Sequence, residues 1–373
     1  MNKPTSIYLD LVRFLAAMTV FFVHAGINRY SGGLPILWRF NDLGNDAVTV
    51  FFVLSGLVIA YVADQKEKTL KDYVLSRLAR LYSVAAPALL ATVIFDFLGL
   101  HISPGLYTDW YFQADNPLWR FFANFFFINE LWFSSVKPFS NNPFWSLGYE
   151  FWYYVLFAAA HYLDRPAKYF VIAAVCLFVG PKILVLFPVW ILGVWVYFRI
   201  SGKPVTESAG WVMVLGSMAG YLIFRFTGAP KLLLDWTNAC YGGAFANCRH
   251  LGFSQFFLSS YVIGALVAIN FVGISAVARR LAAAIERSEV PIRYLASFTF
   301  SVYLFHFPLL QLFAAASRTI ENVTLRSAIT VFGTLVAIWA LGTVTERRKS
   351  DCKRWLLAAW DAIQRRGSIG LRG

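Results

Sequence analysis

The sequence predicts an all-α membrane protein, a polytopic helical bundle of about ten transmembrane helices. Of its 373 residues, 58% are hydrophobic and only 14% are charged, whereas a soluble domain carries about 25% charged residues. The hydrophobic residues come in runs of about 20, the length that crosses a bilayer core as a helix. Lysine and arginine cluster beside these runs, which indicates membrane orientation and not nucleic-acid binding.

Ten segments have the length and composition of membrane spans. In chain order they cover residues 7–27, 43–63, 83–100, 143–163, 169–181, 183–199, 210–226, 254–274, 294–315 and 325–345. The fifth and sixth are short, and only Pro181-Lys182 separates them. If the N-terminus is placed in the cytoplasm, the inner segments hold more than twice as many lysines and arginines as the outer segments. The positive-inside rule therefore predicts that both termini are cytoplasmic.

Residues 119–133 are apolar but do not fit this pattern simply. The segment has only about 15 residues, short for a span, and Asn124, Asn129 and Glu130 interrupt it. Counting it as a span would also place Arg165 and its neighbours outside. We therefore interpret it as a re-entrant or interfacial helix on the outer side, and the alternative is an eleventh span.

Surface segments complete the organisation of the chain. Residues 69–82 combine a basic face with regularly spaced leucines, which predicts an amphipathic helix on the cytoplasmic surface. In the outer loop 227–253, Cys240 and Cys248 fit a disulfide in an oxidising compartment, and they fit two free thiols equally well. We divide the chain into a membrane domain, 1–348, and a short basic tail, 349–373.

The first span carries ionisable residues that a passive anchor would not keep. Charged residues at the centre of a span cost about 2.5–3.5 kcal/mol each, so those that remain usually face a protein interior or a wet cavity. Arg13 and His24 lie on one stripe of the helix, roughly 16 Å apart along its axis, and Asp10 lies one turn before Arg13. Because charges interrupt this run, we expect no cleavable signal peptide. Three alternatives stay open: Arg13 extends to the interface, Asp10 is only its counter-ion, and His24 is a packed polar contact.

Two later spans also carry titratable residues. Glu150 in the fourth span lies at a depth comparable to that of His24, which fits a histidine base with a carboxylate that orients or tunes it. The alternative is that Glu150 pairs with an interfacial arginine. The ninth span holds a second histidine, His306, with Ser301 and Tyr303 nearby. For His306, a structural hydrogen bond is favoured over catalysis.

Several motifs occur in order along the chain. They are LDLVRFLAAMTVFFVH in the first span, VFFVLSG in the second, SRLARLY after it, WSLGYEFWYY in the fourth, SVYLFHFPL in the ninth and Glu346-Arg347 after the last. Over about residues 1–348 they resemble the motifs of acyltransferase family 3, a family of integral membrane acyltransferases. The chain departs from the family at Thr49, where many members have an acidic residue and Asp46 lies one turn earlier. It also has Arg348 where the family often has proline. Ser55-Gly56 in the second motif predicts close helix packing.

The resemblance implies a donor and an acceptor. Family members move an acyl group, commonly acetyl, from cytoplasmic acyl-CoA to a hydroxyl of an extracytoplasmic or lipid-linked glycan, and we expect this chain in the inner membrane of a bacterium. Acyl-CoA would be a co-substrate, and we expect no bound cofactor and no metal. Arg13, Arg77 and Arg80 would hold the CoA phosphates, which the planar guanidinium suits.

The same resemblance assigns roles at the reacting centre. We expect His24 to act as general base on the acceptor hydroxyl or to carry the acyl group itself, with Glu150 and Asp10 completing the catalytic group. The candidates for contacts with the substrate or the oxyanion are Ser146, Ser301, Tyr303 and His306. The rival function is a transporter of a glycan or small solute, against which stands the absence of an internal repeat. A structural scaffold would leave the buried charged residues unexplained.

Overall fold

The computed structural model describes residues 1–31, 43–108, 111–241 and 248–369. Within these ranges all regular structure is helical, which confirms the predicted all-α class. Ten helices correspond in order to the ten predicted spans: α1 (Lys3–Ala25), α3 (Gly44–Gln65), α4 (Leu70–Ile102), α6 (Trp145–Tyr162), α7 (Ala167–Val179), α8 (Pro181–Ser201), α9 (Glu207–Phe226), α11 (Phe257–Val277), α14 (Thr299–Ala316) and α15 (Val323–Val344).

Eight of these ten helices are long and apolar enough to cross a membrane. The other two are α6 and α7. α7 has only 13 residues, and α6 carries Glu150 and several tyrosines, which make it more polar. The chain is therefore a multi-pass membrane protein, and α6 is largely buried in spite of these polar residues.

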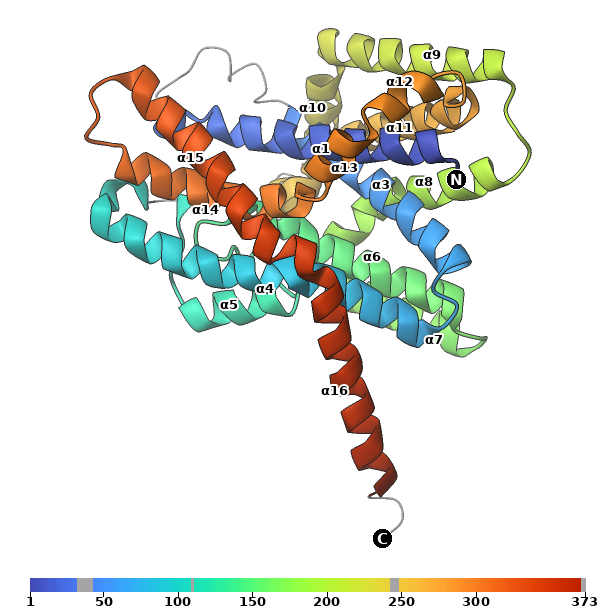
Figure 1. The fold of residues 1–373 in the computed structure, drawn as a ribbon, viewed down its shortest axis with the longest axis horizontal. Coiled ribbons are helices and arrows are strands. Elements are labelled where there is room, and N and C mark those ends of the chain that lie inside the picture. The colour runs from blue at the N-terminus through green and yellow to red at the C-terminus, as the bar shows by residue number, and fades with distance from the viewer. Residues whose placement is uncertain (32–42, 109–110, 242–247, 370–373) are drawn as a thin grey trace.

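The bundle has two sides, which the course of the first helices defines (Figure 1). We call the side where α1 begins the N-terminal side. α3 ends there, and α4 and α14 begin there. α16 (Lys349–Ile369), red in Figure 1, follows α15 through the short turn η6 (Glu346–Arg348) and projects from the bundle. Among the short helices are α2 (Asn28–Ser31), η2 (Pro104–Leu106), η4 (Asn142–Phe144), α12 (Ala282–Arg287) and α13 (Glu289–Ala296).

α4 corrects one prediction from the sequence. Residues 69–82 do not form a separate surface helix, because they are the first part of a continuous helix of 33 residues that also contains the span predicted at 83–100. Pro87 lies inside the second part, and the helix continues through it. Arg77 is buried in an ion pair with Glu67, at 2.8 Å between Nη2 and Oε1. The basic face of this segment therefore turns into the bundle.

The segment predicted at 119–133 contains no helix long enough to cross a membrane. Its helix, α5 (Pro117–Phe125), has nine residues and extends about 14 Å, less than half the thickness of a bilayer core. Leu118, Trp119 and Phe122 are exposed on it, which is typical of an interfacial helix. The irregular chain that follows is held to the start of α8 by a buried ion pair between Glu130 and Lys182 (2.5 Å). Burial raises the pKa of the Glu130 carboxyl, and Lys182 opposes this.

The loop predicted at 227–253 contains two further helices, α10 (Ala229–Tyr241) and η5 (Cys248–Phe256). The Cys240 thiol is free and exposed. The side chain of Cys248 lies outside the described residues, as do residues 370–373 of the predicted tail.

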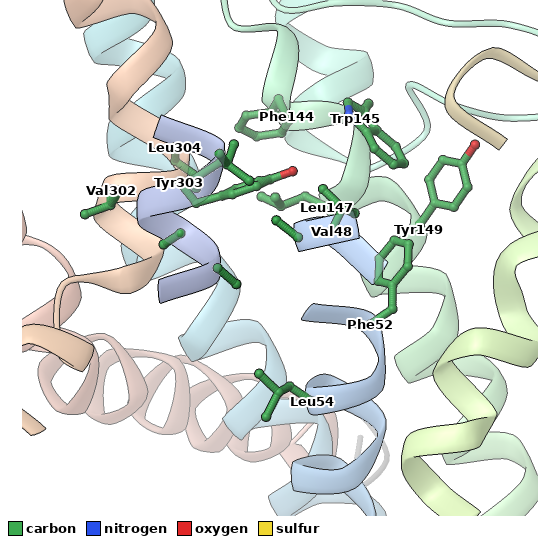
Figure 2. Packing of buried hydrophobic residues seen from close by; sticks show 14 of the residues in the cluster. Val48, Phe52, Leu54, Phe144, Trp145, Leu147, Tyr149, Val302, Tyr303 and Leu304 are labelled. Carbon is green, nitrogen blue, oxygen red and sulfur yellow. The ribbon is translucent and has the colours of Figure 1, made fainter. Parts of the chain in front are cut away.

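The closest helix packing joins α3 to α8. A Cβ atom added at Gly56 would lie 2.0 Å from the carbonyl oxygen of Trp190, and one added at Gly193 would lie 2.0 Å from that of Val53. Only glycine allows the two backbones to approach this closely, as the Ser55-Gly56 pair predicts. Beside this contact lies the buried core, in which side chains of α3, α6 and α14 interdigitate (Figure 2).

Candidate active site

A cavity of about 620 Å³ opens among the helices on the N-terminal side. Its walls come from α1, α3, α4, α6, the start of α14 and the junction between α15 and α16. The cationic side chains that line it are Arg13, Arg77, Arg80, Arg347, Lys349 and Lys353. We call it the basic cavity. It brings together all three arginines that the sequence predicts to hold phosphates.

These cations differ in how far they are neutralised. Arg77 pairs with Glu67, and Nη1 of Arg13 lies 3.1 Å from Oδ1 of Asp10. Among the residues that the structure describes, the lining cations with no carboxylate oxygen within 4.0 Å are Arg80, Arg347, Lys349 and Lys353. The cavity therefore keeps an excess of positive charge that suits an anionic ligand.

A second cavity, of about 610 Å³, lies toward the opposite side of the bundle. We call it the histidine cavity, because His24 at the end of α1 lines it. The other polar and charged side chains on its wall are Asn45, Asp46, Asn142, Arg225, Lys231, Ser259, Ser260 and Tyr303. Trp145 and Phe253 also line it, and their rings stack with centroids 4.4 Å apart. Polar groups beside an aromatic surface suit an organic ligand with many hydroxyls.

The two cavities share part of their walls. Val48 and Tyr303 line both, and Figure 2 shows Tyr303 reaching from α14 toward Val48 of α3 and Leu147 of α6. The Tyr303 hydroxyl forms a hydrogen bond of 2.7 Å with Oγ of Ser146. Two hydroxyls carry two protons and their mutual bond uses one, so one donor proton remains at this junction.

His24 has a specific partner, which is His306. Nδ1 of His24 lies 2.8 Å from Nε2 of His306, and Nδ1 of His306 lies 2.8 Å from the carbonyl oxygen of Val302. His306 has no exposed surface, whereas His24 is half-buried and lines a cavity. The favoured sequence interpretation of His306 as a structural hydrogen-bonding group is consistent with these contacts.

Glu150 does not lie where the sequence suggests. It lines the basic cavity, and its Oε1 accepts hydrogen bonds from Oγ of Ser55 (2.8 Å) and from the Tyr154 hydroxyl. No contact with His24 and no ion pair with an arginine is found among the described residues. An equal depth in the membrane does not decide the direction in which a side chain points, so the predicted partnership has no geometric support.

Two other predicted residues are also occupied elsewhere. Asp10 accepts hydrogen bonds from Arg13 (3.1 Å) and Arg293 (2.9 Å) and lines neither described cavity, so it is a counter-ion at the N-terminal side. Ser301 donates both its backbone N–H (2.8 Å) and its hydroxyl (2.9 Å) to Glu346. Ser301 therefore has no free donor for an oxyanion.

Asp46 lies where a carboxylate can act on the histidine cavity. Its Oδ2 accepts a hydrogen bond of 2.8 Å from the Tyr221 hydroxyl and lies 3.6 Å from Nε of Arg225. Thr49 instead donates to the backbone of Asn45 (2.9 Å). The carboxylate one turn before Thr49 thus reaches the same cavity as His24.

The predicted tail contributes residues to the basic cavity that sequence reasoning missed. Lys349 and Lys353 of α16 line it together with Glu346 of η6, which belongs to the predicted membrane domain and to the last sequence motif. Their spacing of three and four residues places them on one helical face, a periodicity that was visible in the sequence. Lys353 also donates to Oγ of Ser76 on α4, at 2.8 Å.

The family model for acyltransferase 3, described as an acyltransferase domain, matches residues 6–343. The chain belongs to the acyltransferase 3 family. No curated protein and no solved structure matches it. As an acyltransferase 3 protein it is a membrane acyltransferase, and the matched range contains His24, His306 and three of the arginines that line the basic cavity, Arg13, Arg77 and Arg80. The match ends before Glu346, so α16 adds to the family domain.

Proposed function

We propose that this acyltransferase 3 protein transfers an acetyl group from cytoplasmic acetyl-CoA to a hydroxyl of an extracytoplasmic or lipid-linked glycan, in the inner membrane of a bacterium. The observation that carries the proposal is the pair of cavities that share Val48 and Tyr303. One is rich in cations and the other contains a histidine. Two substrates that arrive from opposite sides of a membrane require such a pair.

The basic cavity suits the donor. Coenzyme A carries several phosphate charges, and Arg80, Lys349 and Lys353 are cations without carboxylate partners among the described residues. The positive-inside bias of the sequence favours the N-terminal side as the cytoplasmic side. The roughly 16 Å along α1 from Arg13 to His24 is a distance that an extended pantetheine arm can bridge.

The histidine cavity suits the acceptor. Its aromatic surface of Trp145 and Phe253 can pack against a sugar ring, and the amide and hydroxyl groups around it can bind sugar hydroxyls. His24 is the group on its wall whose side chain can accept a proton near neutral pH without carrying a permanent charge.

The transfer is a single displacement at the junction. The acceptor oxygen attacks the carbonyl carbon of the thioester while His24 takes the hydroxyl proton. The Tyr303 hydroxyl, held by Ser146, donates a hydrogen bond to the oxyanion of the tetrahedral intermediate. The new C–O bond remains, the C–S bond breaks, and the CoA thiolate takes up the proton. The products are an O-acetyl ester and CoA.

Labelled acetyl-CoA tests this function. Membranes from cells that produce the protein, incubated with acetyl-CoA labelled in the acetyl group, should yield labelled glycan, and mass spectrometry of surface glycans should show O-acetyl groups that depend on the protein. The variant His24→Ala should abolish both signals at an equal protein level. His101→Ala is the matched control, because His101 is exposed near the end of α4 and lines neither cavity.

Two results would contradict the proposal. If labelling in His24→Ala equals that of the wild type, His24 does not take part in the transfer. If the wild type consumes no acetyl-CoA, and glycans move across vesicles that contain the protein, the chain acts as a transporter.

A further inference from the structure

We propose that His306 is a positioning residue that fixes the tautomer of His24, so that Nε2 of His24 is the atom that accepts the proton. The catalytic consequence rests on the proposed function, whereas the tautomer itself does not. This gives His306 a role distinct from contact with the substrate or the oxyanion.

The geometry around the pair is tight and apolar. The two imidazoles meet through Nδ1 of His24 and Nε2 of His306, at 2.8 Å. Phe307 packs edge-on against the His24 ring, with centroids 5.0 Å apart, and Phe21 packs against His306 at 6.3 Å. Both phenylalanines are fully buried. No carboxylate oxygen lies within 4.0 Å of either histidine among the described residues.

A backbone carbonyl decides where the protons are. The oxygen of Val302 can only accept, so Nδ1 of His306, 2.8 Å away, must carry a proton. A neutral imidazole has one N–H, so Nε2 of His306 then holds a lone pair. The hydrogen bond between the rings therefore has His24 as its donor. Neutral His24 must carry its proton on Nδ1 and its lone pair on Nε2.

This arrangement prepares His24 for proton transfer. With Nδ1 bonded to His306, the ring edge left for the histidine cavity is the one that contains Nε2. Without an acceptor at His306, the His24 ring could rotate or take the other tautomer, in which Nε2 carries a proton and cannot act as a base. His306 cannot replace it, because both its nitrogens are bonded and it lines neither described cavity.

Two substitutions separate this role from simple packing. In His306→Gln, the side-chain amide can place its oxygen near the position of Nε2 and accept from His24. In His306→Asn, the shorter amide reaches only the region of Nδ1 and can bond to Val302 but not to His24. Both variants are polar and smaller than or similar to histidine in volume, so they form a matched pair.

Nitrogen NMR reads the tautomer directly. The protein, labelled with ¹⁵N in its histidines and placed in bilayers, should show His24 with a proton on Nδ1 and none on Nε2. The resonance is assigned by its loss in His24→Ala. His306→Gln should keep this tautomer, and His306→Asn should give a population with the proton on Nε2. A wild-type protein with the His24 proton on Nε2 would overturn the proposal, whatever its activity.

Kinetics test the consequence in native membranes with acetyl-CoA as the donor. His306→Asn should lower kcat roughly tenfold or more, since a misplaced base loses part of its contribution of 10²–10⁴, with an unchanged KM for acetyl-CoA. His306→Gln should recover most of kcat. An equal loss in both variants, or a change in KM alone, would mean that the role is not acceptance from His24. A wild type without transfer would refute the proposed function, while the NMR result would still decide the tautomer.

Discussion

Arg80 differs from Arg13 and Arg77, the two other arginines that the sequence predicts to hold phosphates, because no carboxylate oxygen lies within 4.0 Å of it among the described residues. Arg13 and Arg77 are paired with Asp10 and Glu67. An unpaired guanidinium offers more binding free energy to a phosphate, because it has no existing partner to give up.

We therefore predict that Arg80→Ala raises KM for acetyl-CoA about tenfold or more, since a hydrogen bond to a charged group contributes about 1.5–3 kcal/mol. Initial rates at varied donor concentration measure this. Arg279→Ala is the control, because Arg279 is exposed and lines neither cavity. An unchanged KM in Arg80→Ala would exclude a phosphate contact at this residue.

Tyr303 and Ser146 form a hydrogen-bonded pair at the junction between the cavities, and we expect substitutions of the two residues to lower kcat by different factors. Tyr303→Phe removes the proposed oxyanion donor and should lower kcat on the order of 10²-fold. Ser146→Ala leaves the Tyr303 hydroxyl in place and should lower kcat less. Steady-state rates at saturating acetyl-CoA measure kcat for both variants. A Tyr303→Phe variant with full kcat would remove the tyrosine from the mechanism.

The position of a side chain along its helix could be predicted from the sequence, but the residue on another helix that it contacts could not. The positions of Arg13 and His24 on α1 follow from the rise of a helix, and they line the two cavities. The partner of His24 lies 282 positions away. One sequence contains no signal for that pairing, and Glu150, at a similar depth, points to Ser55 instead.

At the scale of helices, the contact between α3 and α8 places the polar face of α3 against the site. Gly56 makes this contact possible, and its neighbour Ser55 accepts a hydrogen bond from Nε1 of Trp190 (3.1 Å) and donates one to Glu150 (2.8 Å). A methyl group at residue 56 would meet the backbone of α8, which cannot move without moving the whole helix.

Gly56→Ala should therefore lower the free energy of unfolding by about 1–3 kcal/mol, as overpacking does. Thermal unfolding in detergent measures the shift against Gly216→Ala. Gly216 is also inside a span helix, but a Cβ atom there has nothing within 4 Å. Equal stability of the two variants would mean that α3 and α8 can separate without cost.

α16 is the helix that the sequence assigned to a tail and that the structure assigns to a cavity wall. We predict that replacing Lys349 and Lys353 together by alanine raises KM for acetyl-CoA, because two cations leave the wall. Arg354→Ala is the control on the same helix, since Arg354 is exposed and already paired with Asp351 at 2.7 Å. If the double variant has the same KM for acetyl-CoA as the wild type, α16 is not part of the donor site.

Hydropathy predicts the existence of the helices well, because a bilayer demands long apolar segments. It does not predict whether the polar face of an amphipathic segment points to the membrane surface or into the protein. The basic residues of 69–82 resemble a surface helix in the sequence, yet Arg77 is buried because Glu67 compensates its charge. The same limit explains why the contribution of α16 was missed.

At the scale of the whole molecule, the two cavities face opposite sides of the bundle and meet at one tyrosine. The basic cavity is lined by residues near the end of α3 and the start of α4, the side of the bundle on which α1 begins (Figure 1). If that side is cytoplasmic, the donor and the acceptor never need to share a compartment. The acyl group alone would then cross the membrane, at the junction where Val48 and Tyr303 line both cavities.

The sidedness of the reaction tests this account most directly. Inverted and right-side-out membrane vesicles, which expose opposite faces, are each supplied on the outside with labelled acetyl-CoA, which does not cross the bilayer. We predict labelled glycan in the lumen of inverted vesicles only, and none with His24→Ala. Labelling from the outside of right-side-out vesicles, or label that appears only on the face where acetyl-CoA was added, would contradict transfer between the two cavities.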